Sequence, residues 1–145
     1  ALGRVMVDPV YEKYGDVDTS VITLEFDSGA LGVLMNSRRT VYGHDLRVEV
    51  HGSLGKLVAE DERATKVWGY DAGGVHGDFY YHFIERFTDA YRLELQAFVK
   101  AVASGSTPTP GAVDAIESLR VAEAAERSLH EGRTVALDEL RTVTS

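Results

Sequence analysis

Short stretches of alternating apolar and polar residues follow one another through the first half of the chain, separated by turns of only a few residues. In residues 45–51, three aliphatic side chains alternate with Arg47, Glu49 and His51, the period-two pattern of a half-buried strand. Parallel neighbours would need crossover connections of a dozen or more residues. The short turns therefore predict a large, mostly antiparallel β-sheet, with strands at residues 3–7, 18–27, 30–38, 45–51, 56–60 and 65–70.

The pattern changes to helical spacing after residue 82. Apolar residues recur every three or four positions in residues 83–104, which predicts an amphipathic helix ended by Gly105. A second helix is expected at residues 110–131, with Thr109 as its N-cap and a proline at its first position. A last short strand is expected at residues 133–137. This order is typical of an α+β domain with two helices packed on one face of the sheet.

The other face of the predicted sheet has no obvious cover within the chain. Two helices of about 40 residues in total cannot shield both faces of such a sheet. Residues 30–38 are apolar on both faces, so this strand is expected to be covered on both sides. Either another domain or a second copy of the chain must supply that cover, and we expect a homodimer or homotetramer formed through the open face.

Composition excludes several classes of partner. The 145 residues are expected to form one domain, residues 1–145. The net charge of −8 argues against nucleic-acid binding, which needs an excess of Lys and Arg. No cysteine is present, which excludes disulfides and thiolate metal sites and suits a reducing compartment. No apolar run approaches the roughly 20 residues of a membrane span, so a cytoplasmic location is expected. Because the chain lacks an initial Met and soon enters a strand, we expect it to be a piece of a longer polypeptide.

A polar segment at residues 38–45 is the candidate ligand site. It places Tyr42, His44 and Asp45 around a glycine, close to Arg38. A phenol, an imidazole and a carboxylate at one end of a sheet would suit a polyhydroxylated ligand. In the alternative interpretation, Arg38 and Arg39 pair with Asp45 across neighbouring strands and Tyr42 caps the sheet.

Other candidate chemistry is weaker. The spacing of His76, Asp78 and His82 fits no standard metal motif, and no Gly-x-Ser-x-Gly elbow occurs. The glycines at 69–77 are too irregular for a dinucleotide-binding loop and precede no βαβ unit. The acidic run at residues 60–62 is expected to be solvated surface. We therefore predict no catalytic, cofactor-binding or metal-binding residue in this chain.

Ordered motifs extend over residues 18–137 and resemble a known family. They include Leu24-x-Phe26-x-x-Gly29-Ala30-Leu31-Gly32, Tyr42-Gly43-x-Asp45-x-Arg47-Val48-Glu49-Val50-x-Gly52-Ser53-x-Gly55 and Phe83-x-Glu85-Arg86-Phe87. Together they are similar to the C-terminal domain of inositol 2-dehydrogenases, in the glucose–fructose oxidoreductase-like (Gfo/Idh/MocA) family of NAD(P)-dependent dehydrogenases.

The resemblance implies a function for the longer protein. It implies an enzyme that oxidises a polyol such as myo-inositol, or a sugar, by hydride transfer. NAD or NADP would bind an N-terminal Rossmann domain that, like the catalytic Lys and the Asp and His pair, lies upstream. This chain would be the substrate-side and oligomerisation domain, inactive and without bound cofactor by itself. The alternative is an autonomous binding or assembly module that shares the sheet.

The resemblance also suggests which residues contact the substrate. The family's substrate-contacting tyrosine falls in a Tyr-Gly-Tyr-Asp stretch, which here contains His44 in place of the second tyrosine. The expected substrate contacts are Tyr42, His44, Asp45 and Arg38. The aromatic segment around Tyr80 and Tyr81 is expected to form part of the pocket wall.

Overall fold

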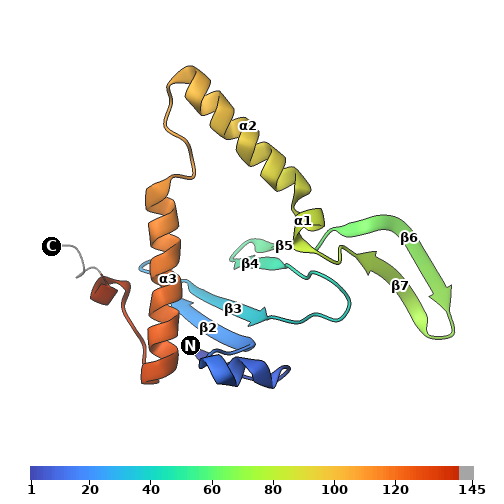
Figure 1. Cartoon of the computed structure of the whole chain (residues 1–145), viewed down its shortest axis with the longest axis horizontal. Helices are drawn as coiled ribbons and strands as arrows, with labels where there is room; N and C mark the ends of the chain where they lie inside the picture. Colours follow the sequence, from blue (N-terminus) through green and yellow to red (C-terminus); the bar gives the residue numbers. More distant parts are fainter. Residues whose placement is uncertain (141–145) are drawn as a thin grey trace. The chain divides into compact units, whose positions relative to one another are not determined.

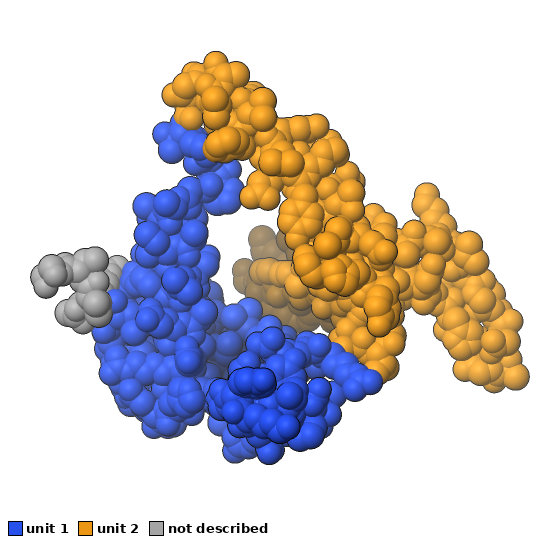
Figure 2. Space-filling model, in the orientation of Figure 1, with its two compact units in different colours: residues 1–39, 107–145 blue, residues 40–106 orange. Residues whose placement is uncertain are grey.

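The computed structural model describes residues 1–140. They form two compact units, one of residues 1–39 with the described part of 107–145, and the other of residues 40–106 (Figure 2). Figure 1 shows the helices and strands of both units.

The first unit combines a small sheet with one long helix. Its elements in chain order are β1 (Leu2–Arg4), the 3-10 helix η1 (Pro9–Tyr14), β2 (Thr19–Glu25), β3 (Leu31–Ser37), α3 (Ala112–Glu131) and the 3-10 helix η2 (Leu137–Leu140). The strands are antiparallel in the order β1-β2-β3. A hairpin turn joins β2 to β3, as the closely spaced strands at 18–27 and 30–38 predict, with Glu25 paired opposite Leu31.

The helix α3 covers one face of this sheet. A Cβ added to Gly3 of β1 would lie 3.3 Å from Cδ1 of Leu129 on α3. Ser20, opposite Gly3, and Ile22 share that face of β2 and line a groove of about 570 Å³ with α3 residues such as Ala125. Side chains alternate along a strand, so the neighbouring residues of β2 and β3 occupy the other face. That face carries exposed Val21, Leu31, Val33 and Met35.

A buried carboxylate fixes the chain where it enters β2. Asp18 is 3% exposed and accepts hydrogen bonds from the backbone N–H groups of Met6, Val7 and Asp8 at 2.8–3.0 Å. The Thr19 hydroxyl donates a fourth bond at 2.8 Å. Burial by itself would raise the pKa of Asp18, but these donors stabilise the ionised form and hold its pKa well below the ordinary range.

The second unit consists of two hairpins and two helices. Its elements are β4 (Val48–Gly52), β5 (Gly55–Ala59), β6 (Arg63–Asp71), β7 (Gly74–Phe79), α1 (Phe83–Arg86) and α2 (Thr88–Ser104). Strand β4 pairs with β5 and β6 pairs with β7, both antiparallel. Gly77 of β7 lies under the Trp68 ring, since a Cβ there would come within 2.9 Å of that ring. The Arg63 guanidinium lies over the Phe79 ring, 3.7 Å from its centre.

The α+β class and the antiparallel pairing are confirmed. The strands, however, are hydrogen-bonded in three groups rather than in one continuous sheet. Residues 38–47 form turns and loop instead of extending the strands on either side. The β2–β3 ladder ends with the Arg38 N–H, which donates to the Asp18 carbonyl, and the loop then bonds to another segment, with the His44 N–H donating to the Tyr80 carbonyl.

The strand β7 was not among the expected strands, and two expected helices need correction. Asp71 pairs with Gly74 at the turn between β6 and β7, so the glycine-rich segment 71–77 is mostly strand. The helix expected at 83–104 is divided at Phe87, which leaves helical geometry with ψ 18°. The helix α3 has Gly111 rather than Thr109 as its N-cap residue, and the Gly111 N–H donates to the Asp114 carboxylate at 2.6 Å.

The strand expected at residues 133–137 does not form. Glu139 accepts hydrogen bonds from the Arg133 guanidinium at 2.7 and 3.0 Å and from the Ala136 N–H at 3.0 Å. These bonds curl the segment into η2, and they lower the pKa of Glu139 to about 2. Local ion pairing thus replaces strand pairing here.

The chain leaves much apolar surface exposed. Its buried apolar residues, among those described, are Ala101 and Ala124. In contrast, Leu31 and Met35 of β3 are 81% and 78% exposed, so the predicted cover for β3 must come from outside this sheet and α3. No helix in residues 1–140 has the length and apolarity to cross a lipid bilayer.

Candidate functional site

The candidate site is built on the loop that precedes β4. Gly43 adopts a φ of 123°, a conformation that favours glycine, and its position admits no side chain because a Cβ would lie 2.7 Å from the Tyr80 carbonyl oxygen. The next residue, His44, donates its N–H to that same carbonyl at 2.7 Å. The Thr40 hydroxyl donates to the Gly43 carbonyl. The loop is therefore fastened to the end of β7.

Tyr42 and Asp45 form a hydrogen-bonded pair on this loop. The Tyr42 hydroxyl donates to Asp45 Oδ2 at 2.5 Å, and its ring packs against Phe79 with centres 5.3 Å apart. The hydrogen bond to Asp45 raises the pKa of Tyr42, and burial and the Asp61 charge add to this. The phenol thus stays protonated at neutral pH, and the exposed Asp45 carboxylate retains lone pairs for further donors.

His44 has a half-buried imidazole with an unsatisfied nitrogen. Its ring contacts Phe87 edge to face, with centres 5.2 Å apart and planes at 86°. Its Nδ1 is buried and has no hydrogen-bond partner within residues 1–140. Burying such a group without a partner is unfavourable, and a ligand hydroxyl could satisfy this nitrogen only after a movement of the loop exposes it.

The acidic run at residues 60–62 was expected to be solvated, and for Asp61 this is wrong. The Asp61 side chain is only 3% exposed, and its Oδ1 accepts the Arg86 Nε–H at 2.6 Å. Its Oδ2 accepts the Leu46 N–H at 3.2 Å. The partner Arg86 lies 25 positions later in the chain, and no periodicity or motif spacing connects such a pair, so only the tertiary structure could reveal it.

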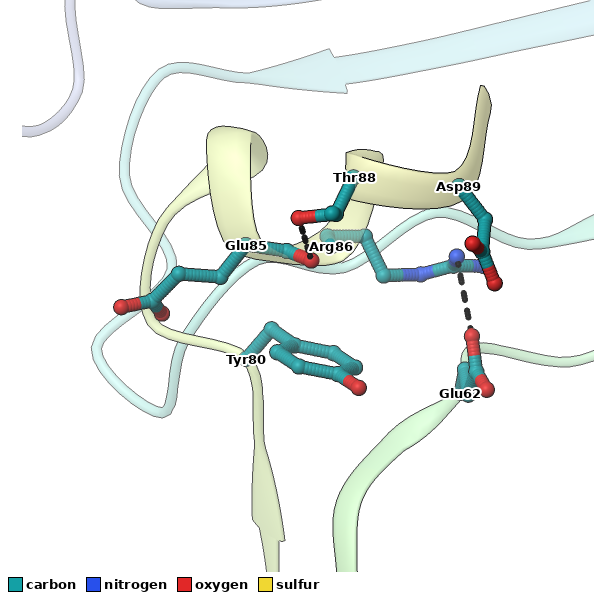
Figure 3. A pocket seen from close by; sticks show the side chains of 6 residues that line it. All are labelled: Glu62, Tyr80, Glu85, Arg86, Thr88 and Asp89. Atoms are coloured by element: carbon teal, nitrogen blue, oxygen red, sulfur yellow. Dashed lines mark hydrogen bonds and ion pairs between the residues drawn. The ribbon is translucent and has the colours of Figure 1, made fainter. Parts of the chain in front are cut away.

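A polar pocket of about 420 Å³ lies beside this ion pair (Figure 3). Figure 3 shows the Tyr80 ring between the helix turn that carries Arg86 and the segment that carries Glu62. The Arg86 Nη1 donates to Glu62 at 3.4 Å. The pocket is lined by Glu62, Tyr80, Glu85, Arg86, Thr88 and Asp89.

The predicted site residues belong to both units. Tyr42, His44 and Asp45 share one loop, and Tyr80 is joined to it through its carbonyl and lines the pocket. Tyr81 is 83% exposed and does not line that pocket. The roles of all these residues stay predictions.

Arg38 belongs to the first unit. Its guanidinium pairs with Asp16 at 3.1 Å and lies over the Tyr11 ring, 5.1 Å from its centre. Within the second unit, Asp45 accepts a hydrogen bond from Tyr42.

The histidines and the aspartate at positions 76, 78 and 82 have partners within the chain. His76 pairs with Asp71 at 3.1 Å, and Asp78 accepts from the Thr65 hydroxyl at 2.9 Å. His82 caps α1 by accepting the Ile84 N–H at 3.3 Å. In the described part of the chain, no cluster of three His, Cys, Asp or Glu side chains is placed to hold a metal ion.

The chain's own residues do not fit a nicotinamide dinucleotide in the usual way. A Rossmann site needs parallel strands joined by a helix whose N-terminus receives the pyrophosphate. Every strand pair within residues 1–140 is antiparallel. The candidate glycines lie in the β6–β7 hairpin, at positions 69, 73, 74 and 77.

Comparison with known proteins identifies the family. Residues 4–137 match the model of the C-terminal alpha/beta domain of the Gfo/Idh/MocA oxidoreductase family. The chain belongs to this family. A crystal structure of a probable dehydrogenase from Thermotoga maritima superposes on 95% of this member and is 47% identical, with a TM-score of 0.90 over 42% of that protein.

Two curated relatives of this Gfo/Idh/MocA domain act on inositols according to their names. Myo-inositol 2-dehydrogenase of Thermotoga maritima is 48% identical over 95% of the chain. The scyllo-inositol 2-dehydrogenase (NAD(+)) of Bacillus subtilis is 42% identical over 98% of the chain. The match covers 42% of each relative, so this domain spans less than half of their length.

Proposed function

We propose that this chain is the substrate-side, C-terminal part of a longer NAD(P)-dependent oxidoreductase that oxidises a polyol such as myo-inositol, or a sugar, by hydride transfer. Membership of the oxidoreductase family supports the reaction class. The similarity to inositol dehydrogenases supports the substrate class. The observation that carries the proposal is the loop at residues 42–45, which brings a phenol, an imidazole and a carboxylate together.

These three groups suit adjacent hydroxyls of a cyclic polyol. The Tyr42 hydroxyl is already committed as a donor to Asp45, so its oxygen can accept a hydrogen bond from a substrate hydroxyl. Asp45 can accept from a second hydroxyl, and the His44 imidazole can bond to a third once the loop exposes its ring nitrogen. Such groups orient a substrate and distinguish its stereoisomers, because an inverted hydroxyl points away from its partner and leaves a polar group unpaired.

The reacting groups are proposed to lie outside this chain. The nicotinamide cofactor, the catalytic lysine and the aspartate and histidine pair belong to the upstream part in this proposal. The antiparallel architecture of residues 1–140 supports this division, since it has no Rossmann unit to hold the cofactor. The isolated chain is accordingly proposed to be inactive.

The proposal is tested with Tyr42→Phe and His44→Ala in the full-length enzyme. Each variant removes a hydrogen-bonding group worth about 1 kcal/mol, so we expect kcat/KM for inositol to fall about fivefold. The KM for NAD should stay unchanged because neither residue belongs to the cofactor domain. Steady-state kinetics with inositol and NAD measure both parameters.

Tyr70→Phe and His51→Ala serve as matched controls. Both parent residues are exposed and lie on strands away from the loop, in β6 and β4. If Tyr42→Phe and His44→Ala have the same kcat/KM as these controls, the loop does not contact the substrate. If the unaltered full-length protein oxidises neither an inositol nor a sugar with NAD or NADP, the proposed activity itself is wrong.

The exposed face of the first sheet is proposed to bind a second copy of the chain. Leu31, Val33 and Met35 of β3 extend along this face without cover from α3. Replacing Val33 with glutamate would place a charge in the centre of that contact, which is strongly unfavourable without a partner. Light scattering after size exclusion should therefore show a smaller oligomer than the wild type forms.

Val113→Glu is the control for this prediction. Val113 is also exposed, at 71%, but lies on α3 rather than on the sheet face. The same oligomer in both variants would show that the β3 face is not the contact.

A further inference from the structure

We propose that the buried ion pair between Asp61 and Arg86 positions the loop at residues 42–45, which carries His44, and holds it in its ligand-binding conformation. The inference rests on the proposed function, in which that loop contacts the substrate. Neither Asp61 nor Arg86 is proposed to react with the substrate. Their effect acts through two connections to the loop.

The first connection runs through the backbone of the loop. Asp61 uses one oxygen for the Arg86 Nε–H at 2.6 Å and the other for the Leu46 N–H at 3.2 Å. At the other end of this stretch, the His44 N–H donates to the Tyr80 carbonyl at 2.7 Å. The residues from 44 to 46 are thus held at both ends, and Asp61 supplies one of these two attachments.

The second connection runs through an aromatic ring. The Arg86 guanidinium lies 5.3 Å from the centre of the Phe87 ring. The same ring contacts the His44 imidazole, with centres 5.2 Å apart. Arg86 therefore restrains the residue against which the imidazole packs, and with it the direction of Nδ1.

The burial of the pair argues for a role beyond stability. The side chains of Asp61 and Arg86 are 3% and 18% exposed, so both charges have lost most of their hydration. A buried ion pair of this kind adds little net stability compared with apolar residues of similar size. What apolar residues cannot reproduce is the directed acceptor for the Leu46 N–H and the cation beside Phe87.

The decisive variant is the double substitution Asp61→Leu with Arg86→Met in the full-length oxidoreductase. Because both charges are removed together, we expect a melting temperature close to that of the wild type. We expect the KM for inositol to rise about tenfold while the KM for NAD and kcat change less than about twofold. Amide hydrogen exchange of the peptide covering residues 42–47 should become at least about tenfold faster, because the Leu46 N–H loses its acceptor.

The matched control is the double substitution Arg127→Met with Glu131→Leu. These two residues form an ion pair on α3, 2.6 Å apart, and are about 40% exposed. This control should alter neither the KM for inositol nor the exchange of residues 42–47. If the Asp61/Arg86 double variant also retains wild-type values of both, the pair has no positioning role and the inference is overturned.

Two further outcomes remain decisive. If the double variant does not fold, Arg86→Lys replaces it: the ammonium keeps the charge pair but loses the planar contact with Phe87, and we expect about a threefold rise in KM for inositol at an unchanged melting temperature. A wild-type KM in Arg86→Lys then overturns the inference.

If the wild-type protein oxidises no inositol, the proposed function fails, and hydrogen exchange alone decides whether the pair positions the loop.

Discussion

Replacing Asp18 with asparagine is expected to lower the melting temperature by roughly 5 °C or more. Both carboxylate oxygens accept two hydrogen bonds each, three from backbone N–H groups and one from the Thr19 hydroxyl. Asparagine has nearly the same shape but turns one acceptor into an NH₂ donor. That donor would face backbone N–H groups in a buried position, so two or more donors lose their partner.

The same carboxylate makes stability depend on acid pH. The pKa of Asp18 is lower in the folded chain than in the unfolded chain, where it is about 3.9. Its stabilising contribution is therefore complete above the unfolded pKa and is lost as the pH falls through the lower folded pKa. Between about pH 5 and pH 2, the melting temperature of the wild type should fall more steeply than that of Asp18→Asn.

Asp27→Asn is the control for both measurements. Asp27 is exposed in the turn between β2 and β3, so its replacement should leave the melting temperature and its pH dependence nearly unchanged. Circular dichroism during heating at a series of pH values follows these changes. Parallel pH curves for wild type and Asp18→Asn would contradict the role given to this carboxylate.

Replacing Gly43 with alanine is expected to destabilise the second unit by about 3 kcal/mol and to impair polyol binding. Two costs combine. A φ of 123° is strained for any residue with a Cβ, and the new Cβ would lie 2.7 Å from the Tyr80 carbonyl oxygen. That carbonyl also holds the His44 N–H, so relief of the clash must move the loop.

Gly74 offers a closely matched comparison. It has the same φ of 123°, but a Cβ there would meet nothing within 4 Å. Gly74→Ala should therefore show only the backbone cost, about 1 kcal/mol, with an unchanged KM for the polyol. Chemical denaturation and steady-state kinetics measure the two effects. Equal losses in both variants would mean that contact with Tyr80 does not shape the loop.

The strands and helices that could be predicted from the sequence are those that depend on the spacing of apolar residues close together in the chain. Alternation located β2 and β3 to within two residues at each end. Helical spacing found α3, whose end at Gly132 follows from that glycine's αL conformation. The errors fall where side chains compete with the backbone. Glu139 binds the 133–137 segment and prevents a strand, and Phe87 interrupts the helix at 83–104.

The candidate site could be located from the sequence only in part. Tyr42, His44 and Asp45 are consecutive or nearly so, and their polarity near a glycine marked the loop. Their hydrogen bonds, such as that between Tyr42 and Asp45, depend on the turn that the loop adopts. The burial of Asp61 could not be inferred, because an acid within a charged run is normally solvated.

The sequence by itself determined the α+β class, the antiparallel pairing of neighbouring strands and the position of the polar loop, because each depends on residues close together in the chain. Tertiary structure decided which charges are buried and what they hold. Asp18 collects donors from residues 10 to 12 positions away, and Asp61 meets Arg86 across 25 positions. Contacts of this kind leave no periodic signal, since they arise only when separate segments pack together and exclude water.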